Sequence, residues 1–467
     1  MAVSGNHKAR SANGGLQSMV AWSSVSKVEW CHMYGGLLKS ASALAIVAAA
    51  GLFGISSAKA ADLGGDCCAD LEERVAELEA TTARKGNRKV SLVISGQIST
   101  QLMFWDDGIR NDVYVNGPGT SNSRWRMVGT AKISSEVTAG FLYEFEAFAS
   151  NQSVNQTNGN GSTVNGTAGD DVGGTGHNLR EALAYIEHSR LGRVTMGHGS
   201  TAANNAILVD LSGKGMAASN DVVLHNSGFL INDGTTYSTT TWANFFNVPG
   251  GSWLNPRIEH IQYRSPTLAG FSVGASFGED NYWDVEGRYS GEFNGVRIAA
   301  RLGYSVFSEF NGAVGALFCT TQCEKSIEQL AGSLSIRHMP TGLFFTGAAG
   351  TRDVKDSDAV GSYDANFYYL SAGIARNFTG LGDTVIYGEY SVWEGNAQET
   401  LGVAFSGTSL DHWGVGIVQH VDAAAMEFWL AYKNHSISGA PAGIVNGIDW
   451  RDAEDIHVII AGTRIRF

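Results

Sequence analysis

Along most of the chain, hydrophobic and polar residues alternate with a period of two, which is the side-chain period of a β-strand. In the segment 124–134 one face is apolar or small, while the other face carries Arg124, Arg126 and Lys132. The segment 296–306 repeats this pattern, again with arginines on its polar face. Strands with one row for lipid and one row for water are typical of a transmembrane β-barrel.

About sixteen segments of this kind follow one another, and an even number is typical of a bacterial antiparallel barrel. Each segment is weak evidence alone, so the prediction depends on their number and order. We expect strands at 90–105, 124–136, 141–150, 179–189, 192–199, 257–266, 271–280, 282–293, 296–308, 326–338, 343–353, 366–378, 383–394, 409–421, 426–437 and 454–467.

Short and long connections alternate between these segments. Asn294-Gly295 is a strong signal for a type I′ hairpin turn, and glycine or proline occurs in short connections such as 190–192 and 339–342. The longer connections, such as 151–178, would then lie together at the opposite rim. This order favours an all-β, transmembrane antiparallel β-barrel over a secreted β-solenoid or adhesin, which is the structural alternative.

The N-terminal part of the chain has the three regions of a secretory signal peptide. A basic stretch ending at Lys39 precedes an apolar run at 41–55, and Ala58-Lys59-Ala60 forms a small-residue cleavage site. We therefore expect residues 1–60 to be an N-terminal extension and signal peptide, cleaved after Ala60, with the start at either Met1 or Met33.

Residues 61–88 contain a short heptad pattern. Leu71, Val75, Leu78 and Thr82 are spaced four, three and four residues apart, which predicts a short coiled-coil helix. About two heptads make a helix that is marginal alone, so it would either trimerise or cap the barrel mouth. The barrel itself would occupy residues 89–467.

Composition and charge narrow the functional classes. The chain has 59 glycines, 6 prolines and a net charge of −13, and its mean hydropathy of −0.07 is too low for a bundle of membrane-spanning helices. Nucleic acid is excluded as a partner, because phosphate binding requires a basic surface. The acidic balance also predicts a mild preference for cations in any channel.

The chemistry-bearing residues indicate neither an enzyme nor a cofactor. The pair Cys319 and Cys323 predicts a small disulfide in an oxidising compartment, with half of a metal site as the alternative. We find no nucleophile elbow, no His-Glu-x-x-His motif and no phosphate loop. We therefore expect no enzymatic activity, no cofactor and no metal site.

The stretch 68–107, from Cys-Ala-Asp-Leu-Glu-Glu-Arg-Val to Trp-Asp-Asp, resembles the mature N-terminus of outer-membrane general porins from rhizobia and related alphaproteobacteria. The final Phe467 resembles the C-terminal assembly signal of bacterial outer-membrane proteins. The resemblance implies a multi-pass, homotrimeric barrel in the Gram-negative cell outer membrane that passes small hydrophilic solutes and ions by passive diffusion. Its other partners would be outer-membrane lipids and the barrel-assembly machinery. A substrate-selective channel for phosphate or sugars is the alternative, followed by a barrel enzyme or an adhesin.

The same resemblance points to a pore constriction in the connection 200–256, because in general porins the third outer loop folds inward. Acidic groups of this loop would face basic groups of the wall across the pore, although several of the basic groups could instead solvate the lumen or rim. The loop candidates are Asp210, Lys214, Asp221 and Asp233, and the wall candidates are Arg124, Arg126, Lys132, Arg288, Arg297 and Arg301.

Overall fold

The computed structural model describes most of the chain after residue 88, and all described residues belong to one compact unit, 74–467. The predicted signal peptide, the heptad helix at 61–88 and the cysteine pair 319 and 323 lie outside the described residues. The described ranges are 89–147, 154–156, 177–220, 228–242, 257–279, 281–308, 326–355, 363–394, 408–439, 444–445 and 447–467.

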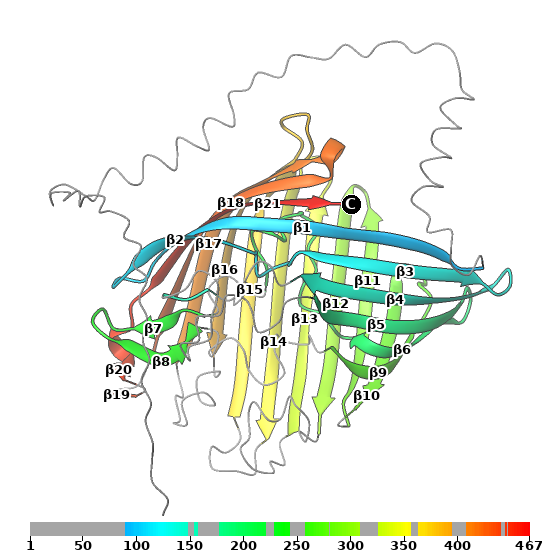
Figure 1. Ribbon diagram of the computed structural model, residues 1–467, viewed down its shortest axis with the longest axis horizontal. Helices are drawn as coiled ribbons and strands as arrows, with labels where there is room; N and C mark the ends of the chain where they lie inside the picture. Colours follow the sequence, from blue (N-terminus) through cyan, green and yellow to red (C-terminus); the bar gives the residue numbers. More distant parts are fainter. Residues whose placement is uncertain are drawn as a thin grey trace, which may run out of the picture. The chain divides into compact units, whose positions relative to one another are not determined.

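The described residues form one large antiparallel sheet of 17 strands, which curves round until its first and last strands meet (Figure 1). Within this sheet each strand pairs antiparallel with the next strand along the chain, as hairpins require, apart from one interruption near the N-terminal end of the sheet. The strands are β1 (Ser91–Asp106), β2 (Asn111–Asn116), β3 (Arg124–Lys132), β4 (Val137–Ala147), β5 (His177–His188), β6 (Gly192–Ser200), β9 (Arg257–Arg264), β10 (Phe271–Gly278), β11 (Trp283–Phe293), β12 (Val296–Phe307), β13 (Ser326–His338), β14 (Leu343–Lys355), β15 (Tyr363–Arg376), β16 (Thr384–Glu394), β17 (Ser409–Val421), β18 (Met426–Ser438) and β21 (Ile456–Arg466).

The closure of the barrel depends on β1. One edge of β1 pairs with β21, while its other edge pairs with β3 over residues 91–97 and with β2 over residues 101–106. The strands β2 and β3 therefore share one position, interrupted at 117–123, and the described sheet is a closed barrel of 16 strand positions. This confirms the predicted fold class, although neither the short β2 nor the interruption was expected.

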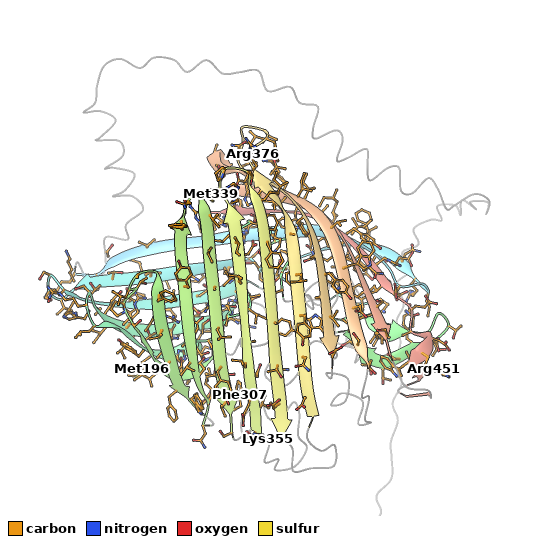
Figure 2. The ribbon with its side chains drawn as sticks, turned by 180° about the vertical axis from the view of Figure 1, so that it is seen from behind. Met196, Phe307, Met339, Lys355, Arg376 and Arg451 are labelled. Carbon is orange, nitrogen blue, oxygen red and sulfur yellow. The ribbon has the colours of Figure 1, made fainter. Side chains whose placement is uncertain are left out.

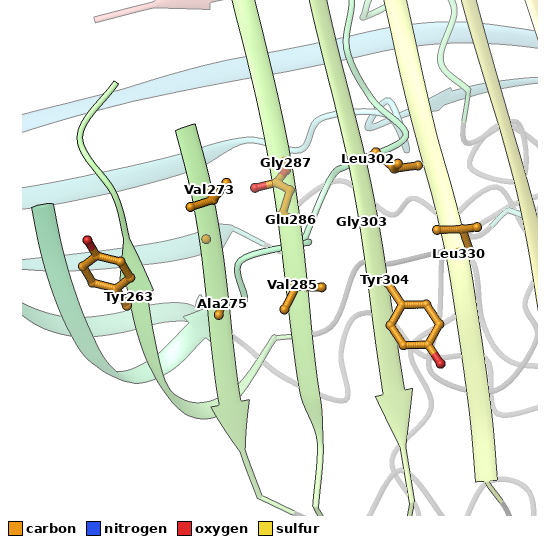
Figure 3. A pocket seen from close by; sticks show the side chains of 11 residues that line it. Tyr263, Val273, Ala275, Val285, Glu286, Gly287, Leu302, Gly303, Tyr304 and Leu330 are labelled. Carbon is orange, nitrogen blue, oxygen red and sulfur yellow. The ribbon is translucent and has the colours of Figure 1, made fainter. Parts of the chain in front are cut away.

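The outward rows of the strands are apolar and exposed. Phe271, Val273 and Leu302 are 60%, 58% and 58% exposed, which is unfavourable in water but suits a hydrocarbon environment. A shallow groove on this face is lined by apolar side chains of β9 to β13, among them Tyr263 and Val285 (Figure 3). Because the groove opens away from the lumen, we assign it to the lipid-facing surface.

The short turns gather at one rim of the barrel. Met339 and Arg376 lie at this rim, while Phe307 and Lys355 lie at the opposite one (Figure 2). In the turn between β11 and β12, Asn294 has φ of 50° and Gly295 has φ of 76°. A type I′ turn requires positive φ at both central residues, so the hairpin has the backbone that the sequence predicted.

Smaller elements lie in the connections. They are the hairpin of β7 (Leu230–Asn232) and β8 (Tyr237–Thr241), the pair β19 (Ile444–Val445) and β20 (Ile448–Asp449), and 3₁₀ turns at Asp422–Ala424 and Trp450–Asp452. Within the part of the chain that the structure describes, no helix is long and apolar enough to cross a bilayer.

Candidate pore constriction

Residues 201–220, here called the inner segment, follow β6 and run along the inside of the barrel wall. The backbone N–H of Val209 donates to the hydroxyl of Ser333 at 3.0 Å, and the N–H of Leu211 donates to the hydroxyl of Ser335 at 3.0 Å. Both serines belong to the inward row of β13, because the leucine between them is exposed on the outside. The wall thus satisfies backbone donors that a buried loop would otherwise leave unpaired.

The inner segment extends along much of the lumen. Near its start, the N–H of Ala202 donates to a serine hydroxyl of β10 at 2.7 Å. Further along, the imidazole Nε2 of His420 on β17 lies 3.1 Å from the carbonyl oxygen of Gly213. The hydroxyl of Thr120, in the interruption between β2 and β3, donates to the carbonyl oxygen of Met216 at 3.0 Å. The segment is therefore bonded to the wall at several separated strands.

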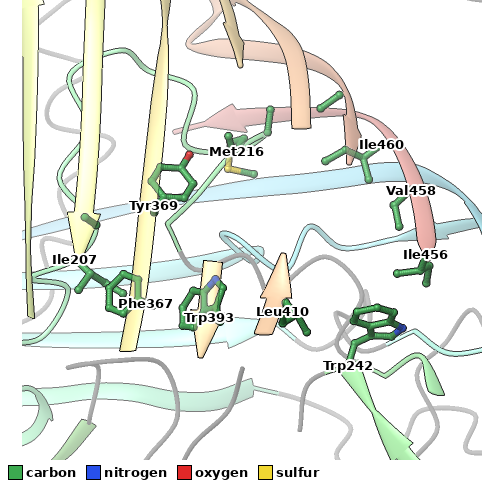
Figure 4. Close-up of a cluster of buried hydrophobic side chains, with 14 of the residues drawn as sticks. Ile207, Met216, Trp242, Phe367, Tyr369, Trp393, Leu410, Ile456, Val458 and Ile460 are labelled. Carbon is green, nitrogen blue, oxygen red and sulfur yellow. The ribbon is translucent and has the colours of Figure 1, made fainter. Parts of the chain in front are cut away.

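Apolar side chains hold the inner segment against the wall as well. Ile207 and Met216 are each 1% exposed and belong to a cluster that includes Phe367, Tyr369 and Trp393 of β15 and β16 (Figure 4). The rings of Phe367 and Trp393 stack with centroids 4.8 Å apart. This packing removes the apolar side chains from water, which strongly favours the folded-in position of the segment.

The inward rows of β15, β16 and β21 therefore differ from the wet row that the alternating pattern predicts. Ile456, Val458 and Ile460 on β21 are fully buried on the inside of the barrel. They are apolar because the described part of the connection 201–242 covers this side of the lumen, including Trp242 (Figure 4). One side of the lumen is dry, so any aqueous passage runs along the remaining wall.

Lys214 lies at the buried side of the inner segment, with only 1% of its surface exposed. Its Nζ is 3.3 Å from Oδ1 of Asp210 and 5.6 Å from the ring centroid of Tyr369, a cation–π contact. Burial raises the pKa of Asp210, but Lys214 and hydrogen bonds from Ser212 outweigh it, so the pKa lies below its ordinary value. Two of the four loop charges selected from the sequence, Asp210 and Lys214, thus neutralise each other.

A buried ionic network continues from Tyr369 into the wall. The Tyr369 hydroxyl donates to Glu389 at 2.7 Å, and Glu389 forms an ion pair with Lys433. His412 places its Nε2 3.3 Å from the same carboxylate, and the side chains of Glu389, Lys433 and His412 are fully buried. Charges buried this deeply are stable only as a bonded set.

A buried carboxylate with several basic partners also occurs on the wall formed by β9, β11 and β12. Glu286 is fully buried and forms ion pairs with Arg264, Arg288 and Arg301; the Arg264 contact measures 3.1 Å. Arg264 and Arg288 also donate to the carbonyl oxygen of Ala202 at 3.3 Å. We call these four charged residues the Glu286 cluster, and it anchors the start of the inner segment.

A second group of the same composition lies on β3, β4 and β5. Glu144, with its side chain 3% exposed, pairs with Arg124 at 3.2 Å, with Arg180 at 2.8 Å and with Arg126. Arg180 also reaches Glu146 at 2.6 Å. We call Glu144 and its three arginines the Glu144 cluster. Such multiple pairing fixes the guanidinium groups in a defined orientation on the wall.

The remaining residues selected from sequence are placed apart from these two clusters. Asp233 is an exposed turn residue between β7 and β8 that accepts from the Thr235 hydroxyl, and Asp221 lies outside the described residues. Lys132 ends β3, and Arg297 pairs with Glu292 at 3.1 Å beside the short turn 294–295.

The C-terminal residue Phe467 lies at the barrel seam. Its backbone exchanges two hydrogen bonds with Gly96, of 2.9 and 3.1 Å, while its side chain is 64% exposed. The ring lies over Gly96, where a Cβ would come within 2.5 Å of it, but most of its surface stays exposed. Its predicted part in assembly stays a prediction.

Sequence analysis missed Glu144 and Glu286, which organise the arginines. The strand register supplies the missing signal. Arg126 lies directly opposite Glu144, and Arg288 lies directly opposite Arg301, two residues along β11 from Glu286. Cross-strand neighbours lie on the same face of the sheet. An acid and an arginine at equal numbers of residues from a short turn could therefore have been predicted to form an ion pair.

The apolar outer face, the closed barrel and the loop bonded inside a charged lumen define a class of protein: a channel of the bacterial outer membrane. The family model of Gram-negative porins matches residues 41–436, and the chain belongs to this family. It is an outer-membrane porin, a channel for passive diffusion of small hydrophilic solutes and ions. Family and fold are those of a channel rather than an enzyme.

Solved structures with the same architecture share little sequence with this chain. The anion-selective porin from Comamonas acidovorans is 16% identical, with a TM-score of 0.53 over 81% of this chain and 100% of that chain. In-vitro folded OmpT, an outer membrane protein of Vibrio cholerae, is 11% identical, with a TM-score of 0.49 over 82% and 99%. OmpF of Salmonella typhi in complex with daunomycin is 12% identical, with a TM-score of 0.47 over 81% and 98%. No curated protein matches the sequence.

Proposed function

We propose that this porin is a general-diffusion channel whose constriction is formed by the inner segment 201–220 and the arginine-bearing wall. The observation that carries the proposal is the series of hydrogen bonds from the backbone of the segment to inward serines, such as Val209 to Ser333 at 3.0 Å. A loop bonded in this way narrows the barrel without closing it, because the wall carrying the Glu144 and Glu286 clusters keeps partly exposed, hydrated arginines.

We also propose that the working unit is a homotrimer in outer-membrane lipid. The heptad pattern at 61–88 supports self-association, and the terminal Phe467 supports recognition by the barrel-assembly machinery. Residues 1–60 would be removed after Ala60 during export, which leaves the heptad neck 61–88 and the barrel domain 89–467. The stretch 68–107 supports membership of the alphaproteobacterial subgroup.

The experiment is single-channel conductance in a planar bilayer, using protein extracted in detergent and refolded, before and after heating that separates trimers on a gel. Large ohmic steps in groups of three are the expected result. Single steps would contradict the trimer. A correctly folded protein that gives no steps would contradict the open channel itself.

A further inference from the structure

In both arginine clusters the carboxylate is more deeply buried than any of its arginine partners. The side chain of Glu286 is fully buried, whereas Arg288 and Arg264 are 34% and 22% exposed. The side chain of Glu144 is 3% exposed, whereas that of Arg126 is 45% exposed. A passing solute therefore meets guanidinium groups first and does not contact the carboxylates that hold them.

Each cluster also carries more positive than negative charge. Glu286 has three arginine partners, Arg264, Arg288 and Arg301, and Glu144 likewise has three. Glu146 offsets part of the surplus at Glu144, where it pairs with Arg180. In a narrow, poorly screened passage, a surplus of fixed positive charge lowers the free energy of an anion and raises that of a cation.

The acid of the inner segment does not offset the positive charge of these clusters. Within the described inner segment, the carboxylate of Asp210 is neutralised by its own Lys214. The net charge of −13 is therefore a poor guide to the charge that a permeating ion meets.

We propose that the channel prefers anions, and that the Glu144 and Glu286 clusters are the groups that select them. The inference rests on the proposed function, since it needs an open passage along this wall. Solutes with paired oxygens, carboxylates and phosphates, match the planar guanidinium donors best. The preference is opposite to the mild cation preference expected from the net charge.

The test is the reversal potential of the channel under a potassium chloride gradient at about 1 M salt on the concentrated side, where charges at the mouths are screened beyond roughly 3 Å. The wild type should pass chloride over potassium by about twofold or more. Arg126→Gln and Arg288→Gln should each reduce this ratio by about a third to a half, whereas Arg126→Lys should retain it.

The matched control is Arg190→Gln, because Arg190 is an arginine of equal charge at the turn beyond β5, where its side chain is 80% exposed and pairs with Glu136. This variant should leave the ratio unchanged. A potassium preference in a folded, conducting wild type would overturn the anion inference and leave the porin function standing. An anion preference that neither Arg126→Gln nor Arg288→Gln alters would overturn the assignment to the two clusters. A folded protein without conductance would instead contradict the proposed function.

Discussion

Gly462 on β21 faces the lumen, where a Cβ would overlap the ring of Trp429 on the neighbouring strand β18. Gly287 on β11 faces outward, and a Cβ there would meet nothing within 4 Å. The first glycine is required because an aromatic ring packs on its backbone, whereas the second leaves room for lipid. At these two positions the same residue type has a packing role in one case and none in the other.

The buried pair of Glu389 and Lys433 leads to a prediction about stability. Glu389→Gln should cost about 3–5 kcal/mol of unfolding free energy, because it leaves the fully buried Lys433 ammonium without its carboxylate. The double variant Glu389→Gln with Lys433→Met should recover a large part of that loss, because the unpaired charge is removed. Denaturant unfolding in detergent, followed by the loss of β-sheet circular dichroism, measures both values.

The control for this pair is an exposed one of the same chemistry. Glu136→Gln breaks the ion pair with Arg190, whose groups are 44% and 80% exposed, and should change stability by less than about 1 kcal/mol. If the single and double variants at Glu389 and Lys433 were equally destabilised, an uncompensated buried charge would not be the cause.

At the scale of elements, the period-two pattern predicted nearly every barrel strand to within a few residues. β2 was missed because Asn111–Asn116 is only six residues long and is flanked by turn-forming residues. The hairpin of β7 and β8 was missed for the same reason. A strand with a long alternating pattern can be predicted from the sequence. A short strand that forms only by pairing with the free edge of a neighbouring strand cannot.

The candidate site was predictable only in part, again for physical reasons. The alternation of apolar and polar residues along the strands is enough to place Arg126 and Arg301 on the inward face. The path of the inner segment depends on contacts between residues more than 100 positions apart, such as Leu211 and Ser335. Nothing in the local sequence of either partner encodes such a contact.

The serine contacts of the inner segment support a prediction about channel noise. The double variant Ser333→Ala with Ser335→Ala leaves the N–H groups of Val209 and Leu211 without acceptors, at a cost of about 1–3 kcal/mol each. The loosened segment should give more frequent brief closures and a wider spread of conductance levels. Single-channel recording at fixed voltage measures both.

A third inward serine provides the control for that variant. Ser371 on β15 is also buried, but its hydroxyl donates to the carbonyl oxygen of Gly388 in the adjacent strand, at 2.9 Å. Ser371→Ala should therefore leave the frequency of brief closures and the spread of conductance levels unchanged. Equal noise in both variants would indicate a general loosening of the wall rather than release of the inner segment.

At the scale of the whole molecule, the barrel has no free edge because β1 accepts β21. The register runs from Gln97 opposite Arg466 to Asp106 opposite His457, and the Phe467 backbone adds two bonds to Gly96. A closed sheet offers no strand edge for aggregation. Closure therefore relies on the main chain at the seam, while the terminal side chain stays on the surface.

The hydrogen bonds of Phe467 to Gly96 involve only the backbone, which leads to a prediction about assembly. Phe467→Ala keeps the two backbone bonds to Gly96, so the refolded variant should unfold at nearly the wild-type denaturant concentration. Its insertion in cells should nevertheless fall several-fold, because the side chain is the proposed recognition signal. The amount of heat-modifiable protein in isolated outer membranes measures insertion, and Phe467→Trp should restore it. Full insertion of the alanine variant would contradict the proposed signal.

The dry side of the lumen has a consequence for how such a channel can change over evolutionary time. The inner segment and the buried inward rows of β15, β16 and β21 fill part of the cross-section of the barrel. The width of the passage and the circumference of the barrel are therefore set by different parts of the chain. Substitutions that thin or thicken this filling would alter the size limit for solutes while every hydrogen bond between strands stays in place. The permeability of the channel could therefore adapt to a new environment while the diameter of the barrel stays the same.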